Sequence, residues 1–317
     1  MATVLPIPRG VRARAAAIAA LALALACAGG SGSANALRVP SARHCPVFPK
    51  TNPWNRRVDR LPVAANSAAI IGSIGVSTGL HADFGSGLWQ RSPIGIPFDV
   101  VTRRTPRSRI SFEYGDESDH VGYPIPKRVH VEGGSDHHAL LFDRSACRLY
   151  ELGGLARSNG RWHAWAGATW SLRSNRVRPA GWTSADAAGL PIFPGLARFD
   201  EVRRGVIDHA LRFTVERTRR AYVYPARHYA SNLTDPDLPP MGLRVRLKSS
   251  FDVRSFPRQA RIVLTALKRY GMLVADNGSN WYITGAPNPG WSNDQLHTLG
   301  RVKGSDFEVV DASKLRP

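Results

Sequence analysis

Cysteine is scarce in this sequence. The 317 residues include only three, at positions 27, 45 and 147. If Cys27 is removed with an N-terminal targeting segment, an even pair remains, and in an oxidising compartment such a pair predicts a disulfide between Cys45 and Cys147. The bond would close a loop of about a hundred residues and restrict the unfolded chain. The alternative is two buried thiols. In the bonded state no cysteine is left to act as a nucleophile.

Long apolar runs are missing beyond the N-terminal segment. Residues 15–26 form an apolar core behind a basic start, and residues 34–36 give the small-x-small pattern of a signal peptidase site. We therefore predict a signal peptide over residues 1–36, a mature chain that begins near Leu37, and secretion. A rival interpretation makes Cys27 a lipid-anchored N-terminus. No later stretch approaches the roughly twenty apolar residues of a transmembrane helix, so we predict no membrane span.

Acidic side chains are few compared with basic ones. The chain has 43 Lys and Arg against 24 Asp and Glu, a formal charge of +19. Without the three arginines of the predicted signal peptide, 40 cations face 24 anions, which leaves +16. This charge raises nucleic acid or an acidic polymer as a partner. The arginines are scattered in pairs, however, and no run alternates with aromatics as a nucleic-acid groove would, so we do not predict nucleic-acid binding.

The sequence also lacks a Ser/Gly linker and internal repeats. We therefore predict one extracellular domain over residues 37–317, acting as a monomer. Three strand-like runs in its middle, 137–143, 147–152 and 161–172, are separated by short turns and predict an antiparallel meander. The meander carries these ionisable and aromatic residues: Asp136, His137, His138, Glu151, His163, Trp162, Trp165 and Trp170.

Convincing helical periodicity is almost absent. Between Pro257 and Gly271, apolar residues recur at helical spacing while the charged residues face outward. Elsewhere short strands prevail: residues 241–248 alternate apolar and cationic side chains like a half-buried strand, 222–231 is another aromatic strand, and 271–283 predicts a hairpin about Asn277-Gly278. We expect a mainly β fold, an antiparallel β-sandwich or jelly roll with one covering helix at about 257–270.

Six strings of this sequence resemble a group of secreted bacterial proteins. The resemblance spans residues 44–310 and implies one extracellular, β-rich domain and no particular activity. It is carried by DHHALLFDRSACRLYEL, RVRPAGWTSADAAGLPI, IDHALRFTV, YPARHYAS, PPMGLRVRLK and ALKRYGMLVADNGSNWYITGAP.

Several catalytic and metal-binding motifs are missing. No Gly-x-Ser-x-Gly elbow is present, which argues against a Ser/His/Asp hydrolase. The His137-His138 pair lacks the His-x-His spacing of a cupin, and adjacent residues of a strand point to opposite faces. Residues 115–126 bunch carboxylates in a Gly/Pro loop but lack EF-hand spacing, so a solvated turn is favoured over a calcium loop. We predict no cofactor and no metal site, while a calcium or transition-metal ion stays open.

Acids, histidines and aromatic residues are nevertheless dense on the predicted sheets. A glycosidase needs two carboxyl groups across one cleft, and a lyase needs a base near a neutralised carboxylate. Aromatic rings stack on sugars. We predict a secreted carbohydrate-active enzyme, a polysaccharide hydrolase or lyase; the alternatives are a non-catalytic polysaccharide- or cell-wall-binding protein and, third, a metal-dependent extracellular enzyme. The candidate catalytic residues are Asp83, Asp136, His138, Asp208, His209 and His228, and the candidate substrate-binding residues are His81, Glu151, Trp170, Tyr224 and Arg227, with Trp89, Trp162 and Trp165 as further stacking surfaces.

Overall fold

The N-terminal arm is tied to the central hairpin by a disulfide. The computed structural model describes residues 38–315, in which Cys45 and Cys147 are bonded with an S–S distance of 2.00 Å and a Cα–Cα distance of 5.2 Å. Phe48 and Trp54 of the arm are both only 2% exposed. The predicted disulfide is therefore confirmed, whereas the predicted signal peptide and Cys27 lie outside the described residues.

A four-stranded sheet forms around the predicted central hairpin. Its order is β12-β9-β8-β4, and β8 and β9 pair antiparallel as expected, while β4 runs parallel to β8. Leu140 packs in one hydrophobic core and its neighbour Leu141 in another, so both faces of the sheet are covered. The bounds are β4 Phe98–Val101, β8 Ala139–Asp143, β9 Arg148–Gly153 and β12 Ala166–Ser171.

The third predicted run of the meander divides into two strands. β12 stays in the four-stranded sheet, but β11 (Arg161–Ala164) joins β10 (Ala156–Ser158) and β6 (Ile110–Phe112) in a separate three-stranded sheet. The break falls at Trp165, whose backbone N–H donates to Gly153 O at 2.7 Å. Because Trp165 belongs to neither strand, its side chain is released from the core and is 41% exposed.

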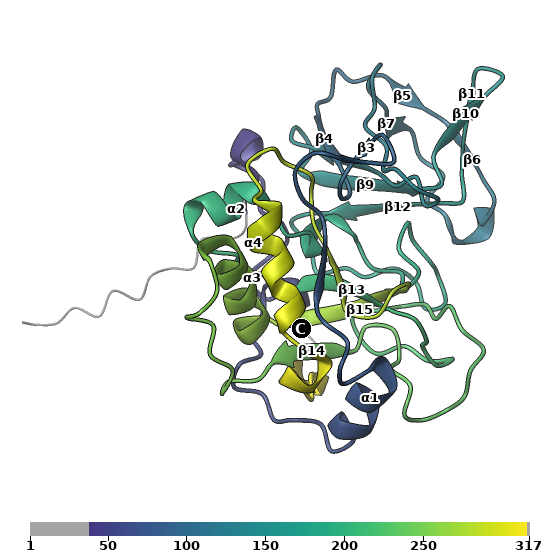
Figure 1. The fold of residues 1–317 in the computed structure, drawn as a ribbon. Coiled ribbons are helices and arrows are strands. Elements are labelled where there is room, and N and C mark those ends of the chain that lie inside the picture. The colour runs from purple at the N-terminus through teal and green to yellow at the C-terminus, as the bar shows by residue number, and fades with distance from the viewer. Residues whose placement is uncertain (1–37, 316–317) are drawn as a thin grey trace, which may run out of the picture. The chain divides into compact units, whose positions relative to one another are not determined.

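The largest sheet of the described residues has six strands in the order β1-β16-β13-β15-β14-β17. Figure 1 labels three of them, β13, β14 and β15. The predicted hairpin of β15 and β16 is wrong, because β13 lies between them. The connecting turn bonds to β13 through Gly278 N to Val215 O and Trp281 N to Thr214 O, so the chain passes over the end of β13. The bounds are β1 His81–Asp83, β13 Leu211–Val215, β14 Arg244–Leu247, β15 Met272–Asn277, β16 Tyr282–Thr284 and β17 Phe307–Val309.

β14 is buried on both faces, which corrects the prediction of a half-buried strand. Arg244 and Arg246 are only 2% and 8% exposed. The Arg244 guanidinium donates to the carbonyls of Pro53 and Arg56, and Arg246 donates to Val58 O and pairs with Glu308 at 2.7 Å. Buried backbone carbonyls need hydrogen-bond donors. The two guanidinium groups thus take the place of water as donors to the carbonyls of the N-terminal arm.

The predicted helix is confirmed as α3, Arg258–Arg269, which ends before Gly271 at a φ of 65°. Its residues Val263, Leu264 and Leu267 are fully buried. It is not the only helix, however, and α2, α3 and α4 gather along one side of the six-stranded sheet (Figure 1). The other helices are α1 Ser67–Ile74, α2 Phe199–Arg204 and α4 Asn293–His297.

The described residues thus form several sheets with few helices, and strands outnumber helices. Four strand pairs of the described residues are parallel, so the sheets are mixed and not antiparallel throughout. The predicted strand at 222–231 is absent from the described residues, which show only a bridge at Tyr222 and a cis bond before Pro225. Short strands are β2 Leu88–Trp89, β3 Ser92–Pro93, β5 Arg107–Ser108 and β7 Tyr123–Pro124; 3-10 helices cover Pro40–Ala42, Pro53–Asn55, Gly115–Glu117, Phe193–Gly195, Thr298–Arg301, Gly304–Asp306 and Ser313–Leu315.

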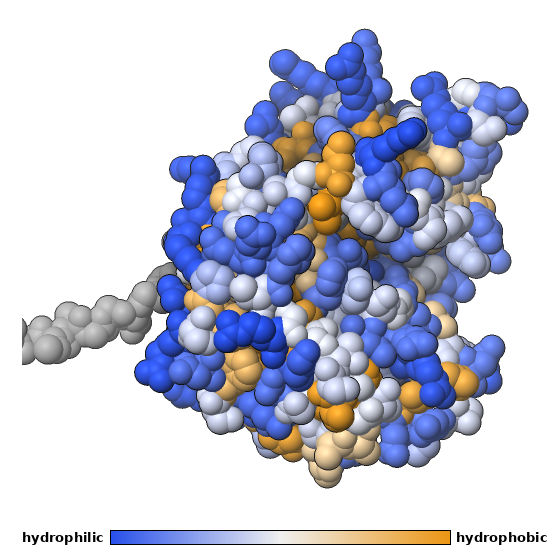
Figure 2. Space-filling model, viewed as in Figure 1, coloured by the Kyte–Doolittle hydropathy of each residue, from blue (hydrophilic) through white to orange (hydrophobic). Residues whose placement is uncertain are grey.

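All described residues fall within one compact unit. Hydrophilic side chains dominate the face drawn in Figure 2, and hydrophobic ones are scattered among them. Among residues 38–315, no helix has the length and apolar character needed to cross a membrane.

Candidate functional site

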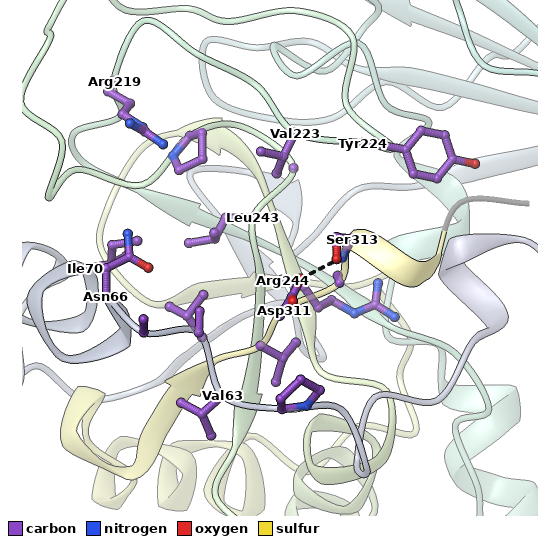
Figure 3. A pocket seen from close by; sticks show the side chains of 18 residues that line it. Val63, Asn66, Ile70, Arg219, Val223, Tyr224, Leu243, Arg244, Asp311 and Ser313 are labelled. Atoms are coloured by element: carbon purple, nitrogen blue, oxygen red, sulfur yellow. Dashed lines mark hydrogen bonds between the residues drawn. The ribbon is translucent and has the colours of Figure 1, made fainter.

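The described residues enclose several cavities of about 310 to 450 Å³, and two of them compete as the site. The first, of about 420 Å³, is lined mainly by apolar side chains such as Val63 and Leu243. Figure 3 shows its two arginines, Arg219 and Arg244, well apart, and the Arg244 guanidinium points away from Leu243. Because no acid and base converge among its described lining residues, this cavity could hold a ligand but lacks the groups for acid–base catalysis.

The second cavity, of about 380 Å³, gathers carboxyl, imidazole and aromatic groups. Its walls come from the loop after β6, the loop before β8, the ends of β9 and β15, and residues 183–187 and 228–230. Pockets that combine a few convergent polar groups with aromatic walls are typical ligand sites. Its functional side chains are Tyr114, Glu117, Asp136, His138, Trp165, His228 and Asp276.

Asp276, near the end of β15, is placed to hold a proton. Its side chain is 24% exposed and its Oδ2 lies 3.3 Å from Arg212 Nη2. Arg212 is already engaged by Asp186, at 2.9 Å and 3.0 Å, so one guanidinium serves two carboxylates. Burial raises the pKa of Asp276 to about 7, and the charge of Asp186 acts in the same direction while Arg212 opposes it. A carboxylic acid with such a pKa can donate a proton near neutral pH.

Glu117 and His228 form a second polar pair on the cavity wall. Glu117 Oε2 accepts the backbone N–H of Thr183 at 2.8 Å and lies 4.0 Å from His228 Nε2. His228 Nδ1 lies 2.8 Å from Ala187 O, and because a carbonyl only accepts, Nδ1 carries the hydrogen. His228 Nε2 is therefore the nitrogen directed to Glu117 and to the cavity.

His138 is fixed from both sides. Its Nδ1 contacts Glu132 Oε2, and its Nε2 lies 2.9 Å from Ala185 O. Both partners are acceptors, so both ring nitrogens must donate and the ring is an imidazolium. Burial alone would lower the pKa of His138, but the hydrogen bond to Glu132 outweighs it and raises the pKa to about 9. His138 therefore cannot act as the catalytic base that the sequence suggested.

The same hydrogen bonds bear on metal binding. Glu132, Asp136 and His138 offer ligand atoms within 4.8 Å of one another. A metal would have to displace a hydrogen bond from each His138 nitrogen it used, and metal-bound imidazole is neutral. In the loop of residues 115–126, where calcium was the less favoured interpretation, Asp119 is held by Arg178 at 3.1 Å and by Thr169 N at 2.7 Å. These donor sets therefore fit a hydrogen-bonded network better than a metal centre.

Two exposed aromatic rings stand at the cavity rim. Tyr114 is 52% exposed and Trp165 41%, and Tyr114 N donates to Trp165 O at 2.9 Å, which places the two residues side by side. A Cβ built on Gly154 would lie only 2.5 Å from the indole of Trp165. The ring therefore rests against a position where no larger residue fits, and Gly154 itself has a φ of 68°.

A third aromatic lies on a hairpin beside the site. The β2–β3 hairpin exposes Leu88 by 67% and Trp89 by 62%. A Cβ on Gly133 would lie 2.3 Å from Ser92 of this hairpin, so the hairpin packs against the loop that carries Glu132. Trp89 is thus an exposed ring on a hairpin that lies next to the Glu132 loop.

The structure places Asp136, His138 and His228 around one cavity, but it does not bring Asp208 or His209 there. Asp208 pairs with Arg204 at 3.6 Å. His209 is fully buried, lies 3.2 Å from Glu201 Oε2 and donates to Ala210 O. A side chain with no exposed surface cannot meet a substrate, so His209 is corrected to a structural ion pair.

Glu151 is likewise corrected, because it is fully buried. Its carboxyl oxygens accept the backbone N–H groups of Ile192 and Phe193, each at 2.8 Å. Burial raises the pKa of Glu151 to about 8, although these two hydrogen bonds act in the opposite direction. The residue positions the 192–193 backbone and does not contact solvent.

The other predicted binding residues lie outside the cavity wall. Trp170 is buried in the core, and Tyr224 lines the larger cavity. Arg227 donates to Arg178 O at 3.0 Å. On β1, the exposed His81 stacks on Tyr282 at 4.1 Å. Asp83, which was predicted to be catalytic, does not line the cavity either, but its carboxyl group interacts electrostatically with Glu132 and Asp136.

Sequence reasoning missed Asp276 and Tyr114 altogether, and considered Glu117 only as a calcium ligand. Asp276 directly precedes the Asn277-Gly278 turn, which made it resemble an ordinary turn former. What could have singled it out is its position at the end of an otherwise apolar strand.

Comparison with known proteins gives no family for this chain. No protein-family model matches it, and neither the curated proteins nor the solved structures include a match. Its function must therefore be argued from the cavity.

Proposed function

We propose that this protein is a secreted carbohydrate-active enzyme, and that the 380 Å³ cavity binds and cleaves a polysaccharide. One observation carries the proposal: carboxyl groups of Glu117, Asp136 and Asp276 line the same cavity whose rim exposes Tyr114 and Trp165. Sugar-cleaving sites combine paired carboxyl groups with aromatic rings that stack on sugar faces.

In this proposal Asp276 is the general acid. Its pKa of about 7 keeps much of the carboxyl group protonated at neutral pH, so it can protonate the leaving glycosidic oxygen. Arg212, which contacts Asp276 at 3.3 Å, then stabilises the carboxylate that remains.

The base comes from the Glu117–His228 pair. Glu117 would serve a hydrolase, by activating water or attacking the sugar, whereas His228 Nε2 would serve a lyase by removing a ring proton. Hydrolysis is favoured because, among the described residues, no Lys or Arg lines the cavity to neutralise the uronate carboxylate that a lyase requires. The proposed chemistry uses no metal ion.

Secretion and the sandwich arrangement are also part of the proposal. The disulfide and the lack of a membrane-spanning helix among residues 38–315 are compatible with an extracellular protein. We propose that the four- and six-stranded sheets act as the two walls of a sandwich-like scaffold, as the many short strands of the sequence predict.

Turnover of a polysaccharide panel by the Asp276→Asn and Glu117→Gln variants tests the proposal. Each should lower kcat by about 100-fold or more, because each removes one proton-transfer group. Asp252→Asn is the matched control, since Asp252 is an exposed carboxylate paired with Arg254 away from the cavity. Equal rates for all four proteins on a cleaved polymer would contradict the assignment.

The pH dependence of kcat/KM tests the same assignment of Asp276 as the acid. Because the acid must be protonated, kcat/KM of the native enzyme should fall as the pH rises through about 7. A rate that rises steadily from pH 6 to pH 9 would exclude Asp276 as the donor.

A non-catalytic polysaccharide-binding protein is the second candidate, favoured by the exposed Leu88–Trp89 pair on the β2–β3 hairpin. In that case the panel would show binding that Trp165→Ala weakens, with no turnover of any polymer.

A further inference from the structure

The cavity has a charge opposite to that of the protein around it. The whole chain carries 43 basic and 24 acidic residues. Among the residues that line the cavity, however, three are carboxylic acids, Glu117, Asp136 and Asp276, two are histidines, and none is Lys or Arg. In such a basic protein, an acidic lining is the reverse of what random placement of charge would produce.

The cations behind the wall do not reverse this charge. Arg212 is bound by the Asp186 carboxylate at 2.9 Å and 3.0 Å. The His138 imidazolium is held by Glu132. Each of these cations therefore already has its own anion. A ligand in the cavity meets the carboxyl groups of the lining, which these cations do not neutralise.

The cation that sequence reasoning assigned to an acidic sugar is not present at the wall. Arg227 is not among the lining residues, and its Nε donates to Arg178 O at 3.0 Å. Asp83, which is electrostatically coupled to Glu132 and Asp136, adds further negative charge nearby. An anionic sugar would thus be repelled inside the cavity, although the basic outer surface would attract it.

We infer that the cavity selects polysaccharides that carry free amino groups, in particular unacetylated 2-amino sugars. This preference presupposes the proposed function and names its substrate class. A protonated amine gains a charge-assisted hydrogen bond from Glu117 or Asp136, and Trp165 and Tyr114 can stack on a sugar ring and attract a cation with the same face.

Binding of matched oligosaccharides tests the inference. The probes are a β-1,4-linked glucosamine hexamer, its fully N-acetylated form and a hexagalacturonate, titrated calorimetrically at about pH 6, where the amines are charged. The glucosamine hexamer should bind about tenfold more tightly than the acetylated one, and the gap should shrink as salt is added. Equal or tighter binding of the acetylated hexamer, or of the hexagalacturonate, would overturn the inference.

Variants locate the effect in the cavity. Glu117→Gln and Asp136→Asn should each reduce the preference for the amino hexamer to about threefold or less, whereas Asp252→Asn should leave it unchanged. A preference that survives both cavity variants would overturn the inference as well. Failure of the proposed function looks different: no polymer of the panel is then cleaved, whichever hexamer binds. Cleavage of a neutral polymer without preference for amines leaves the proposed function intact and refutes only the substrate class.

Discussion

At the scale of single residues, the network behind the cavity is built from pairs in which every buried charge has a partner. His138 pairs with Glu132, and Arg212 pairs with both Asp186 and Asp276, with the longer contact to Asp276. Burying an ion is costly unless it is paired. The group left with the weakest partner is therefore the one whose pKa rises to about 7, and it is also the one that faces the cavity.

His138 should make the stability of the native protein depend on pH. Its folded pKa of about 9 exceeds the ordinary 6.5, so its stabilising effect is complete below 6.5 and is lost as the pH rises through 9. We expect the free energy of unfolding to fall by on the order of 3 kcal/mol over this range. The raised pKa values of Asp276 and Glu151 act in the same direction at lower pH.

Urea unfolding at a series of pH values measures this dependence. In His138→Gln, which cannot titrate, the decline between pH 8 and 9.5 should be clearly shallower than in the native protein. Parallel curves for the two proteins would show that His138 is not held as an imidazolium.

At the scale of elements, helix α3 was predicted from hydrophobic periodicity alone. Its apolar stripe predicted both its ends to within a residue and its buried face. Val263, Leu264 and Leu267 are fully buried, and the helix packs against β14 of the six-stranded sheet.

Replacing Leu267 with Ala should lower the free energy of unfolding by roughly 2 to 5 kcal/mol, through lost burial and the cavity left behind. Arg269→Ala, on the exposed side of the same helix, is the control and should change stability by less than about 0.5 kcal/mol. Chemical denaturation measures both. A loss for Leu267→Ala no larger than for the control would mean that the helix face is wrongly assigned.

Local patterns predicted the strands better than their partners. β8, β9, β13 and β14 were found from alternation and turn residues, because those signals are local. The insertion of β13 between β15 and β16 depends on contacts between residues about sixty to seventy positions apart, for which the sequence has no local signal. The same limit explains why Arg244 and Arg246 were expected at the surface: their partners are backbone carbonyls of the distant N-terminal arm.

At the scale of the whole described chain, the site is made by convergence. Glu117 follows β6, Asp136 precedes β8, His228 lies in an irregular segment and Asp276 ends β15. Sequence reasoning selected Asp136 and His228 for their chemistry, but these residues, 92 positions apart, meet only through the fold. Asp208 and His209 carry the same chemistry and were placed elsewhere, so residue type alone could not separate a site from a structural ion pair.

The central claim is that this cavity holds a sugar polymer between its acids and its aromatic rim. A crystal structure of the Asp276→Asn variant, soaked with the glucosamine hexamer and in parallel with its N-acetylated form, tests it most directly. We predict sugar rings in the cavity, one stacked on Trp165, with a glycosidic oxygen within hydrogen-bonding distance of the side chain at position 276. Sugar found only elsewhere, as in the apolar cavity beside Val63 and Leu243, or a cavity that holds no sugar at saturating concentrations of both hexamers, would contradict the claim.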